Sequence, residues 1–159
     1  MRPRVYIETS IPSFYHTVRK SADAIARHDW TRRWWETRSA QYELVTSKAV
    51  LDEIGRSQIP EMRWKRLQML ESVRLLDDAR ELRAIIETYI EHLLMPVDAF
   101  GDARHLAFAS FYRCHFLLTW NCDHLANPNK FEHIRHINAL LKLATPVIVT
   151  PYELLSTKP

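Results

Sequence analysis

The sequence predicts an α/β fold in which one mostly parallel sheet of about five strands is flanked by helices. Short apolar runs, which are typical of buried strands, alternate along the chain with longer stretches of helical periodicity. The length of 159 residues fits a single domain, residues 1–159, with one hydrophobic core. Hydrophobic residues make up 47% and charged residues 26%, and no apolar run is long enough to cross a membrane. We therefore expect one globular three-layer domain without a membrane partner.

Three strands are expected in the first half of the chain, at 5–7, 42–46 and 73–76. Thr9 and Ser10 offer hydroxyl groups that can cap a helix, and Pro12 favours the first turn of that helix. Further helices are expected at about 21–41, 49–54 and 61–72, with a break at 55–60.

The second half begins with Asp78 and Glu81, whose spacing predicts a capping box ahead of an amphipathic helix at 82–94. A helix at about 97–113 follows Pro96 and carries Asp98 and Asp102 one turn apart, on one face. The remaining expected elements are a strand at 116–119, a helix at 129–143, a strand at 147–149 and a short turn at 152–155.

Composition excludes some functions and restricts others. Gly55 and Gly101 lie outside any phosphate-cradling pattern, which argues against a nucleotide cofactor. The net charge of +3 is compatible with a polyanionic partner but is too small to establish one. Cys114 and Cys122 form no Cys-x-x-Cys pair, and the chain begins without a signal-peptide pattern. We expect reduced thiols and a cytoplasmic location.

Four short acidic islands follow strand-like runs or lie on the helices after them. They contain Glu8, Glu53, Asp102, and Asn121 with Asp123. An α/β sheet gathers its active site at the carboxyl ends of its strands, so these side chains are expected to converge. Carboxylates in such an arrangement are the ligands that Mg²⁺ or Mn²⁺ prefers, and such an ion can promote attack on a phosphodiester.

In their order and spacing, these islands resemble the motifs of PIN-domain nucleases. The matching segments are VYIETS at 5–10, Glu53, DARHLA at 102–107, TWN at 119–121 and the closing PVIVTPYELL at 146–155. The resemblance covers essentially the whole chain, and the size is most similar to VapC-like toxins of prokaryotic toxin–antitoxin pairs. It implies a sheet of strand order 3-2-1-4-5, which would place Glu8 beside Asn121 and Asp123.

The resemblance also implies an activity, namely a metal-dependent endoribonuclease that cleaves single-stranded regions of RNA as the toxin of a type II toxin–antitoxin pair. Its partners would be the RNA substrate, a cognate antitoxin protein and a second copy of the chain in a homodimer. The implied metal ligands are Glu8, Glu53, Asp102 and Asp123, with Asn121 completing the site. The hydroxyl groups of Thr9, Ser10 and Thr119 would orient the ligands or the phosphate.

Two positions depart from the family pattern, which usually has Asp in place of Glu8 and often Asp in place of Asn121. Asn121 can offer its carbonyl oxygen to a metal but removes one negative charge. A second hypothesis is therefore a PIN-fold protein with a degraded site, which binds RNA or a partner without cutting it. A third is a nuclease directed at DNA, because the ligands do not distinguish the two sugars.

Several nearby residues have both a functional and a structural interpretation. His105 and His124 could move a proton or contact phosphate, although such histidines more often hold a helix or loop in place. Glu8 could instead cap the helix that follows its strand, and Glu53 could be a solvated or ion-paired helix residue. Asp98 is better explained by a favourable charge at a helix N-terminus. A zinc site is disfavoured because its candidate ligands match no standard spacing; these are Cys114, Cys122, His124, His133 and His136.

The segment at 27–38 interleaves arginines with tryptophans, a pattern that can stack bases and hold phosphates. An amphipathic helix with Trp30 and Trp34 in the core explains the pattern equally well. The family resemblance adds a third use, in which apolar anchors among the early helices form a groove for an antitoxin peptide. Trp120 could stack on a base, but burial at the end of its strand is the favoured interpretation.

Overall fold

The computed structural model describes residues 1–92, 94–96 and 100–156, apart from the side chain of Phe100. A five-stranded, all-parallel sheet crosses the molecule in the order β3-β2-β1-β4-β5, which confirms the expected fold class and strand order. The strands are β1 (Arg4–Ile7), β2 (Glu43–Ser47), β3 (Arg74–Leu76), β4 (Phe116–Leu118) and β5 (Val147–Val149).

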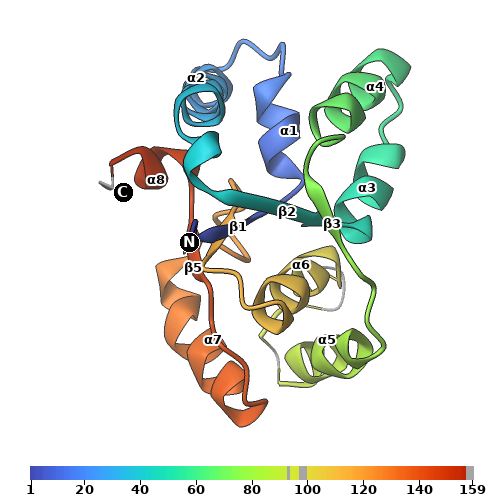
Figure 1. Cartoon of the computed structure of the whole chain (residues 1–159), viewed down its shortest axis with the longest axis vertical. Coiled ribbons are helices and arrows are strands. Elements are labelled where there is room, and N and C mark those ends of the chain that lie inside the picture. The colour runs from blue at the N-terminus through green and yellow to red at the C-terminus, as the bar shows by residue number, and fades with distance from the viewer. Residues whose placement is uncertain (93, 97–99, 157–159) are drawn as a thin grey trace.

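Helices cover both faces of this sheet. Figure 1 shows α1 and α2 on one side, and α5, α6 and α7 on the other. The helices are α1 (Ser10–Tyr15), α2 (Ala22–Thr37), α3 (Lys48–Gly55), α4 (Pro60–Met69), α5 (Glu81–Glu91), α6 (Phe100–Phe111), α7 (Pro128–Leu140) and α8 (Pro151–Ser156). Each parallel connection crosses over through at least one helix, as parallel pairing requires.

The central strand β1 organises the core. Val5 pairs with Leu44 of β2 on one side and with Phe116 of β4 on the other. Val5, Tyr6 and Ile7 are fully buried, because helices cover both faces of a parallel sheet. The reversal of strand order at β1 and β4 makes their carboxyl ends the topological switch point, where an open α/β sheet forms its crevice.

The start of α1 differs from the sequence expectation. Thr9 is the N-cap residue, but its side chain makes no capping hydrogen bond. Instead the carboxylate of Glu8 accepts the backbone N–H of Ser10 at 3.1 Å. The exposed backbone donor is therefore satisfied by an acidic side chain from the end of β1, which is a stronger acceptor than a hydroxyl.

The expected capping box of Asp78 and Glu81 is wrong. Helix α5 has Arg80 as its N-cap residue, and no side chain caps it. The amphipathic face predicted for this helix is present, with Leu82, Ile85, Ile86 and Tyr89 buried. Two smaller differences are a short 3₁₀ helix, Ser39–Gln41, after the end of α2, and the helix α8 where the sequence predicted a turn.

The two cysteines are free; Cys114 is buried, whereas Cys122 is exposed rather than partly buried. No helix within the described ranges is long and apolar enough to span a membrane. Asp98, expected on the same face as Asp102, lies outside the described residues.

Candidate functional site

Glu8 lies at the junction of β1 and β4 and is only 5% exposed. Its backbone N–H donates to the Leu118 carbonyl oxygen at 3.2 Å, which continues the pairing of the two strands by one residue. Its Oε1 accepts hydrogen bonds from the Ser10 hydroxyl and from Thr119 Oγ1, the latter at 2.6 Å. Two of the hydroxyl residues expected to orient ligands therefore hold one oxygen of this carboxylate.

His105, from α6, lies at the centre of the site and is completely buried. Its Nε2 is 2.7 Å from Glu53 Oε1 of α3 and 3.9 Å from Glu8 Oε2. Its Nδ1 is 2.8 Å from the Tyr6 hydroxyl, which in turn lies 2.6 Å from Ser47 Oγ. A chain of hydrogen bonds thus runs from the end of β2 through β1 to the acidic site and fixes the orientation of the imidazole ring.

Glu8, Glu53 and His105 form the group best suited to hold a cation. One ligand atom from each lies within 4.8 Å of the others. Adjacent ligands of a small divalent ion, each about 2.1 Å from it, are separated by about 3 Å, so modest adjustments suffice. The buried Oγ1 of Thr9 has no hydrogen-bond partner among the described residues, which leaves a further oxygen available. The donor set fits Mg²⁺ or Mn²⁺, and the imidazole nitrogen also suits a softer ion.

Hydrogen bonds and charges within this group shift the pKa values of Glu53 and His105 more than burial does. Burial acts to raise the pKa of Glu53, but the hydrogen bond and the positive charge of His105 hold it below its ordinary value. Burial acts to lower the pKa of His105, but the hydrogen bond to Glu53 and the charge of Glu8 raise it overall. The two groups therefore shift each other's pKa in the directions that favour an ion pair between Glu53 and His105.

Asp102, also on α6, is held beside this group by Asn121. Asn121 Nδ2 donates to Asp102 Oδ1 at 2.9 Å. Burial and the charge of Glu8 raise the pKa of Asp102. Asn121, His105 and His124 oppose this shift only in part, so a cation bound nearby would favour the ionised carboxylate.

The sequence suggested that Asn121 could offer its carbonyl oxygen to a metal, but that oxygen is used elsewhere. Its Oδ1 accepts the backbone N–H groups of Asp123 and His124, at 3.2 and 3.1 Å. Both lone pairs of the carbonyl are thereby used to shape the loop after β4. The amide group positions Asp102 and the loop, and its carbonyl faces the backbone.

The remaining expected residues do not join the converging group. Asp123 is exposed, and its carboxylate is not among the clustered ligand atoms of the described residues. His124 is half-buried, with its Nδ1 3.5 Å from Lys130 Nζ. The cysteine and histidine set considered for zinc forms no cluster within the described part of the chain.

Tyr6 and Ser47 were missed by sequence reasoning. Tyr6 lies in a strand that reads as an apolar run, and Ser47 follows the strand predicted at 42–46. Their polar groups become meaningful only when α6 places His105 against Tyr6, 99 residues away in the sequence.

Gly101 creates the space that the Glu53 carboxylate occupies. A Cβ atom on Gly101 would lie 2.8 Å from Glu53 Oε1, closer than an unstrained contact allows. Because α6 tolerates alanine and Glu53 is flexible, we expect Gly101→Ala to fold normally yet displace Glu53. Mn²⁺ affinity measured by titration calorimetry should fall about tenfold, which corresponds to about 1.4 kcal/mol.

Gly55→Ala is the matched control, because nothing lies within 4 Å of the corresponding Cβ position on Gly55. It should leave Mn²⁺ affinity unchanged. Equal affinities for the two alanine variants would contradict the role assigned to the space beside Gly101.

The five-stranded α/β fold is PIN-like, as its similarity to solved structures shows. VapC20 from Mycobacterium tuberculosis, a sarcin–ricin loop cleaving toxin, matches with a TM-score of 0.59 and 18% identity over 76% of this chain and 92% of its own. VapBC2 from Rickettsia felis, bound to a DNA fragment from its promoter, matches with a TM-score of 0.58 and 14% identity over 92% of this chain and 98% of its own.

FitAcB from Neisseria gonorrhoeae matches with a TM-score of 0.56 and 11% identity over 93% of this chain and 98% of its own. No protein-family model and no curated protein sequence matches the chain. At these identities the likeness is one of fold: this chain has the architecture of VapC-like PIN-domain proteins along nearly its whole length.

Proposed function

We propose that this chain is a Mg²⁺- or Mn²⁺-dependent endoribonuclease that cleaves single-stranded regions of RNA. The observation that carries the proposal is the convergence of Glu8, Glu53 and His105 at the switch point of the sheet, with Asp102 held beside them. The sarcin–ricin loop cleaving toxin of the same fold supports RNA as the substrate.

Each residue has a defined task in this proposal. Glu8, Glu53 and Asp102 bind the cation, and Asn121 keeps Asp102 in place. His105 holds Glu53 and is the nearest group to both carboxylates that can donate or accept a proton. When bound, the divalent ion polarises the phosphate and lowers the pKa of the attacking water. Asp123 stays a candidate for a fourth carboxylate on the solvent side.

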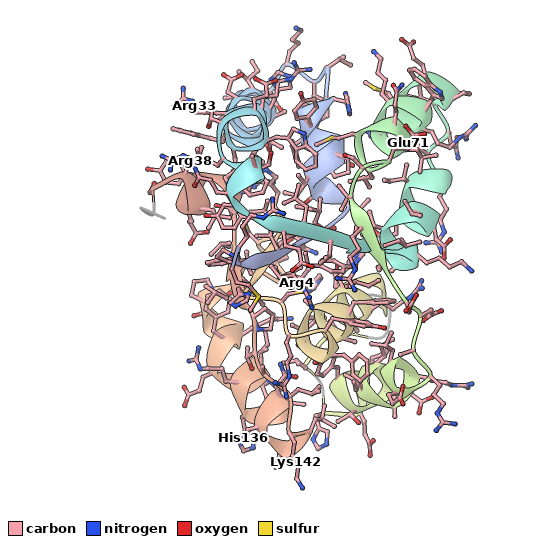
Figure 2. The ribbon with its side chains drawn as sticks, in the orientation of Figure 1. Arg4, Arg33, Arg38, Glu71, His136 and Lys142 are labelled. Carbon is pink, nitrogen blue, oxygen red and sulfur yellow. The ribbon has the colours of Figure 1, made fainter. Side chains whose placement is uncertain are left out.

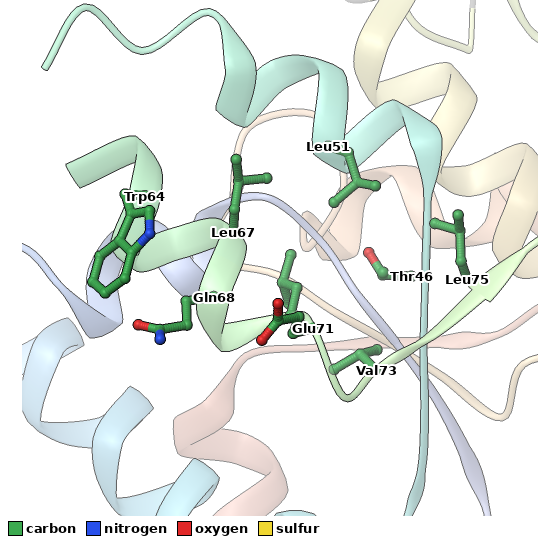
Figure 3. Close-up of a pocket in the computed structure, with 9 residues that line it drawn as sticks. Thr46, Leu51, Trp64, Leu67, Gln68, Glu71, Val73 and Leu75 are labelled. Carbon is green, nitrogen blue, oxygen red and sulfur yellow. The ribbon is translucent and has the colours of Figure 1, made fainter. Parts of the chain in front are cut away.

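We further propose that the protein acts as the toxin of a type II toxin–antitoxin pair in the cytoplasm, with residues 1–159 working as one unit and forming a homodimer. An antitoxin has an apolar surface available to it beside α4 and β3. Figure 3 shows the pocket there, with Trp64 and Leu67 of α4 and Leu75 of β3 at its rim. Trp64 is 61% exposed, and exposed apolar patches of this kind mark interaction sites.

The deciding experiment removes the metal. End-labelled single-stranded RNA is incubated with the purified protein in Mg²⁺, in Mn²⁺ or in EDTA, beside single-stranded DNA and double-stranded RNA. We expect cleavage of single-stranded RNA with either ion, none in EDTA, and recovery when excess Mn²⁺ is added, because the carboxylates need the ion to act on phosphate. Cleavage that persists in EDTA would refute the proposal, and preferential cutting of DNA would redirect it.

A second candidate function is RNA or partner binding without cleavage. It is favoured by one observation, the engagement of the Asn121 carbonyl with the backbone of its own loop, which removes a potential ligand. RNA binding without cleavage in any metal would favour this candidate.

A further inference from the structure

A groove beside the acidic site lies between α2 and α8. It has a volume of about 440 Å³ and includes Arg27 and Trp30 of α2, Trp120 after β4, and Tyr152 of α8. We call it the α2–α8 groove. The metal-ligand candidates do not line it, so it is a separate surface whose use the proposed reaction leaves open.

Trp120 connects this groove to the acidic site. Its backbone N–H donates to Ser10 Oγ at 2.8 Å, and the same hydroxyl donates to Glu8 Oε1. Its indole Nε1 donates to Thr31 Oγ1 at 2.7 Å and anchors the ring, which is only 8% exposed. Trp120 therefore forms a rigid wall of the groove, one hydrogen-bonded residue away from Glu8.

Arg27 supplies a positive charge at this wall. Its guanidinium lies 5.4 Å from the Trp120 ring and 5.3 Å from the Phe14 ring, both within cation–π range. Its Nη1 is 3.5 Å from the Trp120 carbonyl oxygen, a long contact. Among the described residues no carboxylate lies within ion-pair distance of Arg27, so its charge is available to a phosphate.

Trp30 and Tyr152 form an aromatic pair farther along the groove. Their rings meet edge to face with centroids 4.7 Å apart, and Tyr152 is 49% exposed. The Arg33 guanidinium lies 4.9 Å from the Trp30 ring, and Figure 2 shows Arg33 on the outer side of α2. Trp30 is partly buried against the core, so Tyr152 is the exposed ring of the pair, and an exposed ring beside arginines is a usual platform for unpaired bases.

Trp34, another of the three tryptophans on this helix, is fully buried, which confirms its assignment to the core. Two carboxylates also line the groove, and they moderate its charge. Glu153 Oε1 accepts the backbone N–H and the hydroxyl of Thr150, so it is occupied in capping α8. Asp23 lies in the first turn of α2, where the helix dipole favours it.

We propose that the α2–α8 groove binds a nucleotide of single-stranded RNA next to the scissile phosphate, a proposal that rests on the nuclease function above. Tyr152 stacks on the unpaired base, Trp30 contacts the edge of that base, and Arg27 holds the adjoining phosphate. The continuity of the groove with Glu8 through Trp120 and Ser10, together with the unpaired guanidinium, favours RNA over a protein partner here. The pocket of Figure 3, around α4 and β3, is the separate surface proposed above for a protein partner.

The test measures RNA binding separately from cleavage. In the Glu8→Gln background, a fluorescein-labelled single-stranded RNA octamer is titrated with protein and followed by anisotropy. Tyr152→Ala and Trp30→Phe are compared with Trp64→Ala, a matched control on exposed aromatic surface away from the groove. We expect Tyr152→Ala to weaken binding about tenfold, Trp30→Phe to weaken it less because a ring is retained, and Trp64→Ala to have no effect.

Salt dependence tests the phosphate contact. Arg27→Gln removes one contact to a phosphate of single-stranded RNA. The slope of log Kd against log salt concentration should therefore fall by about 0.7. Arg27→Lys keeps the charge and should keep most of the slope, although it loses the planar stacking group.

The outcomes separate this proposal from the nuclease function. If Tyr152→Ala and Arg27→Gln bind the RNA within twofold of their parent while metal-dependent cleavage by the unsubstituted protein is normal, the groove assignment alone is overturned. If the unsubstituted protein neither binds nor cuts RNA, both proposals fall. Loss of a protein partner's binding in Tyr152→Ala, with RNA affinity intact, would assign the groove to that partner and also overturn the proposal.

Discussion

Glu8→Gln is expected to reduce RNA cleavage by roughly a thousandfold while the protein stays folded. A glutamine keeps an oxygen that can accept the hydrogen bonds of Ser10 and Thr119, so the junction of β1 and β4 should survive. It replaces the negatively charged Oε2, 3.9 Å from His105 Nε2, with a neutral group. The substitution thus removes the charge and leaves the local hydrogen bonds.

Cleavage is measured with labelled single-stranded RNA under single-turnover conditions, and Mn²⁺ binding is measured by calorimetry on the same preparation. The melting temperature, Tm, reports folding. Glu71→Gln, on an exposed position of the surface (Figure 2), is the control and should cut like the parent. A Glu8→Gln protein that cuts within tenfold of the parent would place the reaction elsewhere.

Asp102→Asn is expected to have opposite effects on stability and activity. Burial and the charge of Glu8 raise the pKa of Asp102, so keeping it ionised at pH 7 costs free energy of folding. An asparagine can still accept the hydrogen bond from Asn121 without carrying the charge. Without metal, Tm at pH 7 should therefore rise, by roughly 2–4 °C for each kcal/mol relieved, while cleavage falls at least a hundredfold.

The pH dependence follows from the direction of the shift. A carboxyl whose folded pKa is raised destabilises the fold above that pKa, and the penalty disappears as pH falls below the unfolded value near 4. The Tm gain of Asp102→Asn in EDTA should therefore be full at pH 7 and shrink toward pH 4. Asp123→Asn, at an exposed position, should show no such gain. A lower Tm for Asp102→Asn at pH 7 would contradict this account.

The sequence predicted the fold better than the details of the site. Alternating apolar and helical segments predicted the α/β class, and the resemblance to PIN nucleases supplied the strand order that the structure has. Capping was predicted poorly, because Thr9 and Asp78 carry capping side chains whose hydrogen bonds depend on the exact path of the chain. Local sequence cannot show that path.

The site illustrates the same limit. The positions of Glu8 and Asp102 at a strand end and on a helix are local features, and the sequence identified both. The central place of His105 depends on Tyr6 and Glu53, which lie about 99 and 52 residues away. The orientation of Asn121 depends on which of its atoms faces Asp102, and residue type does not determine that.

The hydrogen bonds of Glu8, which stands in place of the more usual aspartate, limit how many of its oxygens a cation could use. Oε1 already accepts hydrogen bonds from the Ser10 backbone, the Ser10 hydroxyl and the Thr119 hydroxyl, so only Oε2 faces His105. In the proposed site, Glu8 would thereby offer a cation a single oxygen. Water, the nucleophile of the proposed reaction, would then supply part of the ion's ligands.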